Sequence, residues 1–244
     1  MGTNAVAGPG RAASPRSVAQ REAIVADLRG RGMSHPYWVA ARPSQQERYE
    51  RVMLATIDLA REGGDEAVQM RSVADRSGVS LGTVYTYFQS RDNLLWRATL
   101  AWDASVAERA AGAARDSVSV EDLEGDLVRG IEMYVAEPGL LDAYVRSTLS
   151  DDPLVVAARR ELDWSWWTEF YPNLDLLGPD LAAIAPALLT DVFYSGVLRW
   201  ASGQLELDYV VEQVRNTVRL LIRASRVPAE PTAQPTANTP LFSG

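Results

Sequence analysis

The chain has 244 residues, 47% of them hydrophobic, which is enough for one large domain or for a small and a medium one. It contains no cysteine, which excludes a disulfide framework and cysteine-based zinc sites or catalysis. No window approaches the roughly 18 uninterrupted apolar residues of a membrane span, and the N-terminus lacks the apolar core of a secretion signal. We therefore expect a soluble, cytoplasmic protein.

Charge is distributed unevenly along the chain, whose net charge is −8. Residues 1–99 contain 13 arginines and 10 acidic residues, a net charge of +3, whereas residues 100–244 contain 11 arginines and 22 acidic residues, a net charge of −11. Salt screens charges over about 10 Å, so the acidic part does not prevent the basic part from binding an anionic partner. No lysine is present, so arginine has to make every cationic contact.

The first 43 residues predict a partly disordered N-terminal extension. Residues 1–16 are rich in Gly, Ala, Ser and Pro, and residues 17–28 can form one helix. The next helix is predicted from Ser44, where Ser44 and Glu47 fit a capping box, and is predicted to end at Gly63.

Residues 69–95, QMRSVADRSGVSLGTVYTYFQSRDNLL, predict two short helices around a tight turn and the start of a third. Gly78 favours a helix end because glycine tolerates a positive φ, and Ser80 can cap the next helix. That second helix is too short to be stable alone, so we expect it to pack through Val84 and Phe88.

The other side chains of the second short helix are expected to face outward: Gly82, Thr83, Tyr85, Thr86 and Tyr87. Gly82 costs helix stability but lets the backbone approach another surface. This pattern is typical of a helix-turn-helix, whose second helix enters the DNA major groove. The alternative is a plain helical hairpin with the tyrosines in its core.

The remaining residues predict further helices and no strands. Ser90 can cap a long helix to about Arg115, and Asp152 and Asp208 can each cap a later one. The predicted fold class is all-α with about nine core helices. Residues 44–98 form a three-helix helix-turn-helix domain, residues 99–227 a larger helical ligand-binding and dimerisation domain, and residues 228–244 a disordered tail.

The run GVSLGTVYTYFQSRDNLL resembles the recognition helix and following segment of TetR-type transcriptional repressors, and the match extends over residues 46–96. The resemblance implies DNA contacts at Gln69, Arg71, Ser80, Leu81, Gly82, Thr83, Tyr85, Tyr87 and Arg91. Arg71 would reach a phosphate or a guanine edge, the two tyrosine hydroxyls would reach phosphates, and Arg91 would hold the DNA backbone from a helix N-terminus. Leu81 stands where the resemblance implies a polar residue that contacts a base. Its contact would therefore be apolar, as with a thymine methyl.

The resemblance also implies a ligand cavity among the body helices. The candidate residues are Trp102, Met133, Tyr134, Tyr144, Trp167, Phe170 and Phe193, with Arg146 as an anion anchor. Ordinary core packing is the alternative for each aromatic residue. Residues 67–88 also resemble the steroid-catabolism repressors of this family, which by analogy implies a large hydrophobic effector, a steroid or an acyl-CoA thioester.

The sequence offers little for catalysis. His35 is the only histidine, so no Ser-His-Asp set or histidine-based metal cluster can form, and we expect no metal, no cofactor and no enzymatic activity. Asp151 and Asp152 form an incomplete metal-binding motif, and Asp152 is explained as a cap. An all-α lipid- or isoprenoid-handling enzyme, and a ligand carrier without DNA binding, remain alternatives.

The last two helices both have apolar faces, which predicts a four-helix bundle with the same pair from a second chain. A homodimer would present two recognition helices to a palindromic operator. The sequence thus predicts a dimeric repressor released by its effector, with the effector, the operator and the choice between repression and activation left open. The extension is either a solvated tail, favoured for residues 1–16, or an arginine arm that follows DNA.

Overall fold

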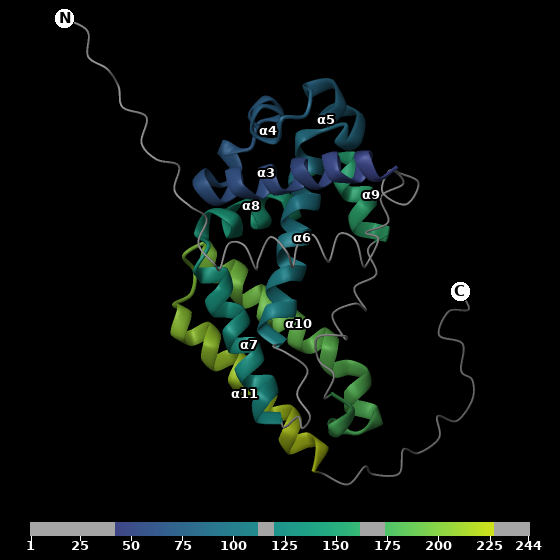
Figure 1. The fold of residues 1–244 in the computed structure, drawn as a ribbon. Helices are drawn as coiled ribbons and strands as arrows, with labels where there is room; N and C mark the ends of the chain where they lie inside the picture. The colour runs from purple at the N-terminus through teal and green to yellow at the C-terminus, as the bar shows by residue number, and fades with distance from the viewer. Residues whose placement is uncertain (1–41, 112–119, 162–173, 227–244) are drawn as a thin grey trace, which may run out of the picture.

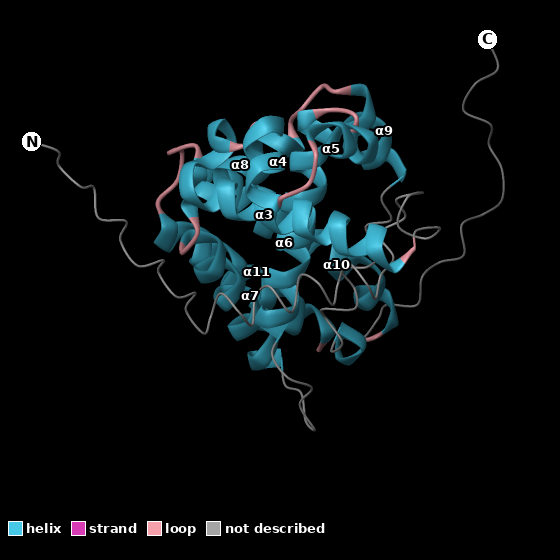
Figure 2. Ribbon diagram, turned by 45° about the horizontal axis from the view of Figure 1, so that its top comes forward, coloured by secondary structure: helices cyan, strands magenta, loops and turns pink. Residues whose placement is uncertain are grey.

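The computed structural model describes residues 42–111, 120–161 and 174–226. These residues form nine α-helices and one 3-10 turn, and Figure 2 shows the described part of the chain as helices joined by loops, without a strand. The predicted helix over residues 17–28, the candidates Trp167 and Phe170, and the predicted tail lie outside the described residues.

Three helices form the upper part of the molecule in Figure 1, which we call the reading head: α3 (Pro43–Ala67), α4 (Met70–Ser77) and α5 (Leu81–Phe88). They enclose a small core, in which Val52, Val73, Val84 and Phe88 are fully buried. An eight-residue helix is marginal in water alone, so α4 and α5 depend on this burial. The predicted inward positions of Val84 and Phe88 are confirmed.

The helix α6 (Arg91–Ala111) runs from the reading head into the lower part of the molecule, which we call the body (Figure 1). Besides α6, the body comprises α7 (Val120–Val135), α8 (Pro138–Thr148), α9 (Pro153–Glu161), the 3-10 turn η2 (Leu174–Leu177), α10 (Pro179–Ala201) and α11 (Leu207–Ser225). Of these, α9 lies level with α3 in Figure 1. Rows of buried apolar residues hold them together, for example Val210, Val214, Val218 and Leu221 along one face of α11.

Several helix ends follow the predicted local rules. Gly64 breaks the regular geometry of α3 with a φ of 66°. The Ser90 Oγ accepts a hydrogen bond from the Asn93 N–H at 3.1 Å, and the Asp152 Oδ1 accepts one from the Leu154 N–H at 2.7 Å. These side chains cap α6 and α9 as predicted, because the first N–H groups of a helix have no partner within it.

Two predicted caps are wrong. Ser44 lies inside the first turn of α3, which begins at Pro43, and the Arg42 N–H donates to the Gln45 Oε1 at 2.9 Å. Proline is favoured at the first helical position because its φ is already helical and it has no N–H to satisfy there. Likewise, α11 begins at Leu207, so Asp208 lies in its first turn and does not cap it.

The reading head and the body meet along α3 and α8, which lie close together in Figure 1. A Cβ added at Gly139 would lie only 2.6 Å from the Ala60 carbonyl oxygen and 2.9 Å from that of Arg61. Only glycine lets the two helix backbones approach so closely. The Arg61 Nε also donates to the Glu137 Oε2 at 2.7 Å across the same junction.

Candidate nucleic-acid interface and ligand-binding core

The turn between α4 and α5 is set by local geometry. Gly78 has the left-handed conformation, with φ of 66° and ψ of 25°, and the buried Val79 fills the angle between the helices. The Ser80 Oγ accepts a hydrogen bond from the Thr83 N–H at 3.2 Å. Together these residues fix the direction in which α5 leaves the turn, as expected for a helix-turn-helix.

One face of α5 is open to solvent. The exposed fractions of Leu81 and Tyr85 are 39% and 48%, Gly82 and Thr86 are exposed, and Thr83 is half-buried. A Cβ added at Gly82 would have no atom within 4 Å. The structure therefore leaves a bare stretch of helix backbone on this face, flanked by a leucine, a tyrosine and two threonine hydroxyls.

The predicted outward position of Tyr87 is wrong, because the structure places its side chain in the core. Its side chain is only 7% exposed, and its ring lies 6.0 Å from Tyr49 and 6.2 Å from Phe88, measured between centroids. The neighbouring Tyr49 is buried as well, and burial raises its pKa to about 12. Tyr87 is therefore part of the hydrophobic core that supports α5, and Tyr85 alone presents a tyrosine on the α5 face.

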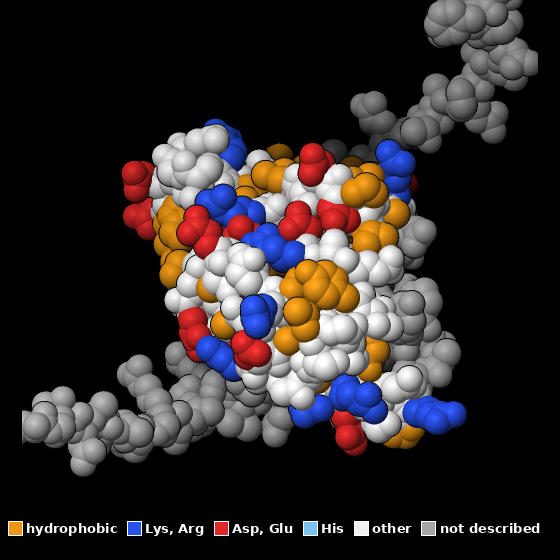
Figure 3. Space-filling model, turned by 90° about the horizontal axis from the view of Figure 1, so that it is seen from above, with side chains coloured by type: hydrophobic (Ala, Val, Ile, Leu, Met, Phe, Trp, Pro, Cys, Tyr) orange, Lys and Arg blue, Asp and Glu red, His pale blue; other side chains and the backbone are white. Residues whose placement is uncertain are grey.

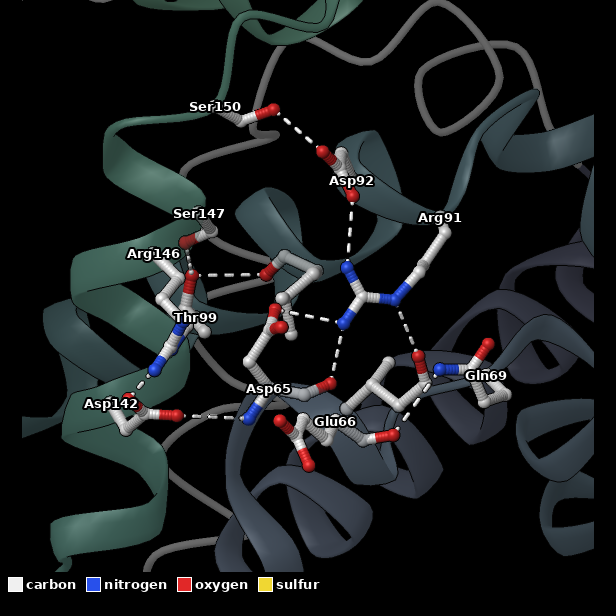
Figure 4. Close-up of polar contacts among 12 residues, drawn as sticks. Asp65, Glu66, Gln69, Arg91, Asp92, Thr99, Asp142, Arg146, Ser147 and Ser150 are labelled. Carbon is white, nitrogen blue, oxygen red and sulfur yellow. Dashed lines mark hydrogen bonds and ion pairs between the residues drawn. The ribbon is translucent and has the colours of Figure 1, made fainter.

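The predicted contact of Arg91 with the DNA backbone also differs from the structure, because the Arg91 guanidinium binds groups of the protein itself (Figure 4). The Nε donates to the Val68 carbonyl oxygen at 2.7 Å, and an Nη lies 2.8 Å from the Asp65 carboxylate. The other Nη lies 3.0 Å from Asp92. Arg91 thus ties the start of α6 to the end of α3 and to the short segment after it, and it does not reach out towards DNA.

The two candidates at the start of α4 stay on the surface. Gln69 and Arg71 are both exposed, and the Gln69 Nε2 donates to the Glu66 carbonyl oxygen at 3.2 Å. Arg76, near the end of α4, instead forms an ion pair with Glu62 at 2.8 Å, and the hydrogen bond from Arg76 lowers the pKa of Glu62. Arg71 is therefore the cation of α4 that remains available to an anionic partner among the described residues.

The body contains a cluster of aromatic rings that brings four ligand-pocket candidates together. Tyr134 lies 5.1 Å from Trp102, 6.2 Å from Tyr144 and 5.6 Å from Phe193 between ring centroids. All four side chains are buried and come from α6, α7, α8 and α10. Met133 is partly buried and packs against this core.

Arg146 does not join this cluster. Its side chain is 61% exposed and pairs with Asp142 four residues earlier, with an Nε–Oδ1 distance of 2.8 Å. The prediction of Arg146 as an anion anchor inside a cavity is therefore wrong. The i, i+4 spacing of Asp142 and Arg146 explains the difference, because such a pair forms on the helix surface without any help from the core.

Asp103 and Tyr194 form a polar centre in the aromatic cluster that sequence reasoning missed. The Tyr194 hydroxyl donates to both carboxylate oxygens of Asp103 at 2.9 Å and lies 3.4 Å from the Tyr134 hydroxyl. Burial, and then the Asp103 charge, raise the pKa of the Tyr194 phenol well above its usual range. The sequence signal was a carboxylate directly after Trp102 within an apolar helix, since a buried charge needs a partner.

No group of three or more His, Cys, Asp or Glu side chains that could hold a metal ion occurs in the described ranges. The groups that the structure brings together in the aromatic cluster are hydroxyls, one carboxylate and aromatic rings. Such a set can bind and orient an organic molecule, with a largely apolar lining and a few polar groups that fix its orientation.

Comparison with known proteins places the helix-turn-helix in a family. The family model described as "Bacterial regulatory proteins, tetR family" matches residues 52–98. The chain is 30% identical over 196 residues to the HTH-type transcriptional repressor KstR of Mycobacterium tuberculosis, covering 73% of this chain and 82% of that protein. KstR of Rhodococcus jostii is 29% identical over 186 residues, covering 73% and 84%.

A solved structure has the same fold. The crystal structure of a TetR transcriptional regulator from Rhodococcus sp. RHA1 superposes with a TM-score of 0.60 at 24% identity, covering 75% of this chain and 98% of that chain. The predicted all-α class with an N-terminal helix-turn-helix is thereby confirmed. The family is one of transcription regulators and not of enzymes, which also confirms the prediction of a DNA-binding, non-enzymatic protein. The chain belongs to the TetR family of bacterial regulatory proteins.

Proposed function

We propose that this protein is a homodimeric repressor that binds a palindromic operator through the reading head and is released by a hydrophobic effector bound in the body. The observation that carries the proposal is the open face of α5, where Gly82 leaves the helix backbone bare beside the exposed Tyr85. A bare backbone lets the helix approach the edges of the bases closely. In this proposal, residues 44–98 are the DNA-binding domain, and residues 99–227 are the ligand-binding and dimerisation domain.

The proposed DNA contacts lie on α4 and α5 and at their caps, and all are exposed except the half-buried Thr83: Gln69, Arg71, Ser80, Leu81, Gly82, Thr83 and Tyr85. Arg71 and Tyr85 would hold phosphates, which position the protein on the duplex. Leu81 and Thr83 would contact base edges through methyl and hydroxyl groups.

The proposed dimer surface is formed by α10 and α11. Ile184 and Tyr209 are 57% and 52% exposed, and Leu188 and Leu220 are 40% and 63% exposed. By length and composition alone α10 could cross a membrane. Only 22% of its most apolar 18-residue stretch is buried, so this chain leaves most of that apolar stretch uncovered. A second copy packed against these helices would cover that apolar surface, and the protein would remain a soluble regulator that acts in the cytoplasm.

The proposed effector site is the aromatic cluster of the body. Trp102, Tyr134, Tyr144 and Phe193 supply an apolar lining, and the hydroxyl of Tyr194 next to Asp103 supplies a polar group. A steroid or the acyl part of an acyl-CoA thioester has matching chemistry, a large apolar body with few polar atoms. The likeness to KstR repressors supports the same class of effector.

A gel-shift experiment tests the DNA-binding surface. The probe is the duplex that the wild-type protein selects from a random-sequence library. Arg71→Ala should abolish retention, and the control Arg160→Ala, which changes an exposed arginine of α9, should not. Thermal unfolding of each variant shows that the fold is intact. Retention by Arg71→Ala equal to that of the wild type would refute this surface.

The effector class is tested on the same complex. A long-chain acyl-CoA and a neutral steroid are titrated separately into the protein–duplex complex, and the concentration that releases the duplex is measured. Tyr194→Phe removes one hydroxyl and keeps the ring, so its release concentration should differ from that of the wild type. If neither compound releases the duplex, the proposal of a steroid or acyl-CoA effector is wrong.

A further inference from the structure

Many arginines of the described chain pair with acidic side chains. Examples, with N–O distances of 2.8 to 3.0 Å, are Arg61 with Asp58, Arg76 with Glu62, Arg146 with Asp142 and Arg215 with Glu212. The view from above in Figure 3 likewise shows basic and acidic side chains next to each other on that face. Arg109 of α6 lies inside the body and differs from these arginines.

The Arg109 guanidinium has an unsatisfied donor. Its side chain is half-buried, and its Nε donates to the Ser105 carbonyl oxygen at 3.0 Å. Its Nη2 is shielded from solvent and has no hydrogen-bond partner among the described residues. Leaving a charged donor unsatisfied is costly, because water no longer solvates the group and nothing replaces the water. An anion brought in by another molecule would therefore bind Arg109 favourably.

Arg109 lies on the same face of α6 as Trp102, a member of the aromatic cluster. The two residues are seven apart, which is two helical turns and a rise of about 10 Å. Helical side chains lean towards the N-terminus, and the hydrogen bond to the Ser105 carbonyl shows that the Arg109 guanidinium lies back over the preceding turn. The unsatisfied donor thus lies within the length of one organic molecule from the cluster.

The nearby carboxylate of Glu137 has other partners. Its Oε1 accepts a hydrogen bond from the Trp102 Nε1 at 3.4 Å, and its Oε2 accepts one from the Arg61 Nε at 2.7 Å. Burial lowers the pKa of Arg109, and the charges of Glu137 and Arg61 then act on it in opposite directions. Glu137 is therefore shared with Arg61 and does not supply the partner that the Arg109 Nη2 lacks.

We propose that Arg109 binds an anionic group, a carboxylate or a phosphate, at one end of the effector, while the apolar part of the effector packs against the aromatic cluster. A guanidinium can hold two oxygens of such a group at once. This inference rests on the proposed effector site and adds a charge requirement to it, so the effector is an amphipathic acid. Arg109 takes the role that the sequence predicted for Arg146.

The experiment compares probes that differ in charge and share the same apolar body. Isothermal titration calorimetry on the full chain without DNA measures the affinities of cholate and of its neutral methyl ester. Dodecyl phosphate and dodecanol form a second pair, which tells a phosphate from a carboxylate. The variants Arg109→Met and Arg109→Gln remove the charge, and Arg146→Met is the matched control on an exposed arginine.

The wild type should bind at least one of the two acids about tenfold or more tightly than its neutral counterpart, as expected for hydrogen bonds to a charged group. Both Arg109 variants should lose this preference by binding the acid more weakly and the neutral probe unchanged, whereas Arg146→Met should keep it. Without a probe, Arg109→Met should unfold at no lower temperature than the wild type, because it removes an unsatisfied buried charge.

Equal affinities of the wild type for the charged and neutral members of both pairs overturn the inference, and so does an unchanged preference in an Arg109 variant. If Arg109→Met does not fold, Arg109→Gln decides, since glutamine can still donate to the Ser105 carbonyl. Failure of the proposed effector site gives a different result, in which no probe binds at all. If only the role of Arg109 is wrong, the acid and its neutral counterpart bind alike.

Discussion

Arg91 and Asp65, which are 26 residues apart in the chain, join α6 to α3 at the point where the reading head meets α6. The Arg91 guanidinium lies 2.8 Å from the Asp65 carboxylate and also binds the Asp65 carbonyl oxygen. The Asp65 N–H in turn donates to the Asp142 Oδ2 of α8 at 3.2 Å, and Asp92 accepts a hydrogen bond from Ser150 at 2.7 Å (Figure 4). The network thus connects the head, α6 and the α8 end of the body.

The first prediction concerns this network. Arg91→Ala should lower the free energy of unfolding by about 2 kcal/mol, because partly buried carbonyl and carboxylate oxygens lose a charged donor. Urea unfolding provides the measurement. The double variant Arg91→Ala/Asp65→Ala should lose less than the sum of the two single variants, since both remove the same interaction. Strict additivity would show that Arg91 and Asp65 do not stabilise the junction together.

The second prediction separates the two tyrosines of α5. Tyr87→Ala should lower the free energy of unfolding by about 3 kcal/mol, because it leaves a cavity in the core of the head. Tyr85→Ala should change it by less than about 0.5 kcal/mol, since its side chain is half exposed.

For operator binding, in contrast to stability, a change at Tyr85 should have the larger effect, which the tyrosine-to-phenylalanine variants can show. Tyr85→Phe removes a hydroxyl from each of the two half-sites and should weaken binding about thirtyfold, at about 1 kcal/mol for each lost hydrogen bond. Tyr87→Phe, whose ring stays in the core, should bind nearly as the wild type does. Anisotropy titrations measure both, and equal losses for the two variants would contradict the assignment of Tyr85 as the outward tyrosine.

The third prediction uses the two glycines Gly82 and Gly125, both of which lie within helices. Gly82→Ala should raise the free energy of unfolding by about 0.5 kcal/mol, because alanine favours the helix and the added Cβ meets no other atom. The same change should weaken operator binding, since the methyl group separates the α5 backbone from the bases. Gly125→Ala in α7 is the control, and it should leave operator binding unchanged. A Gly82→Ala protein with undiminished affinity would show that the bare backbone is not in the interface.

The fourth prediction concerns assembly. Ile184→Glu/Leu188→Glu places two charges on the exposed face of α10 and should convert the dimer into monomers in sedimentation experiments. Leu149→Glu is the matched control, because Leu149 is 73% exposed but lies at the end of α8. If both variants sediment as the wild type does, the dimer surface lies elsewhere.

Short-range sequence rules predicted the helix-turn-helix well. Gly78, Ser80 and Ser90 each act on backbone groups within a few residues, so their roles depend on nothing distant. For the same reason the sequence also predicted the cap at Asp152. Family resemblance then supplied the expected DNA contacts, which local rules alone do not determine.

Long-range contacts explain the errors at Arg91 and Tyr87 and the failure to predict the role of Asp103. Arg91 binds oxygen atoms of Asp65 and Val68, more than 20 residues earlier, and no local pattern marks a carbonyl oxygen as the partner of a particular arginine. Tyr87 is buried by Tyr49 of α3, so its position depended on how α3 crosses α5. Asp103 was missed because its partner Tyr194 lies 91 residues away.

The close contact at Gly139 limits how the molecule can move. Because α8 touches the backbone of α3 and its Asp142 also holds the Asp65 N–H, the head and α8 form a single mechanical unit. If α8 slid along α3, the two backbones would clash at Gly139, because no side chain lies between them that could move aside. In the proposed dimer, a swing that changes the separation of the two heads would therefore take α8 with it.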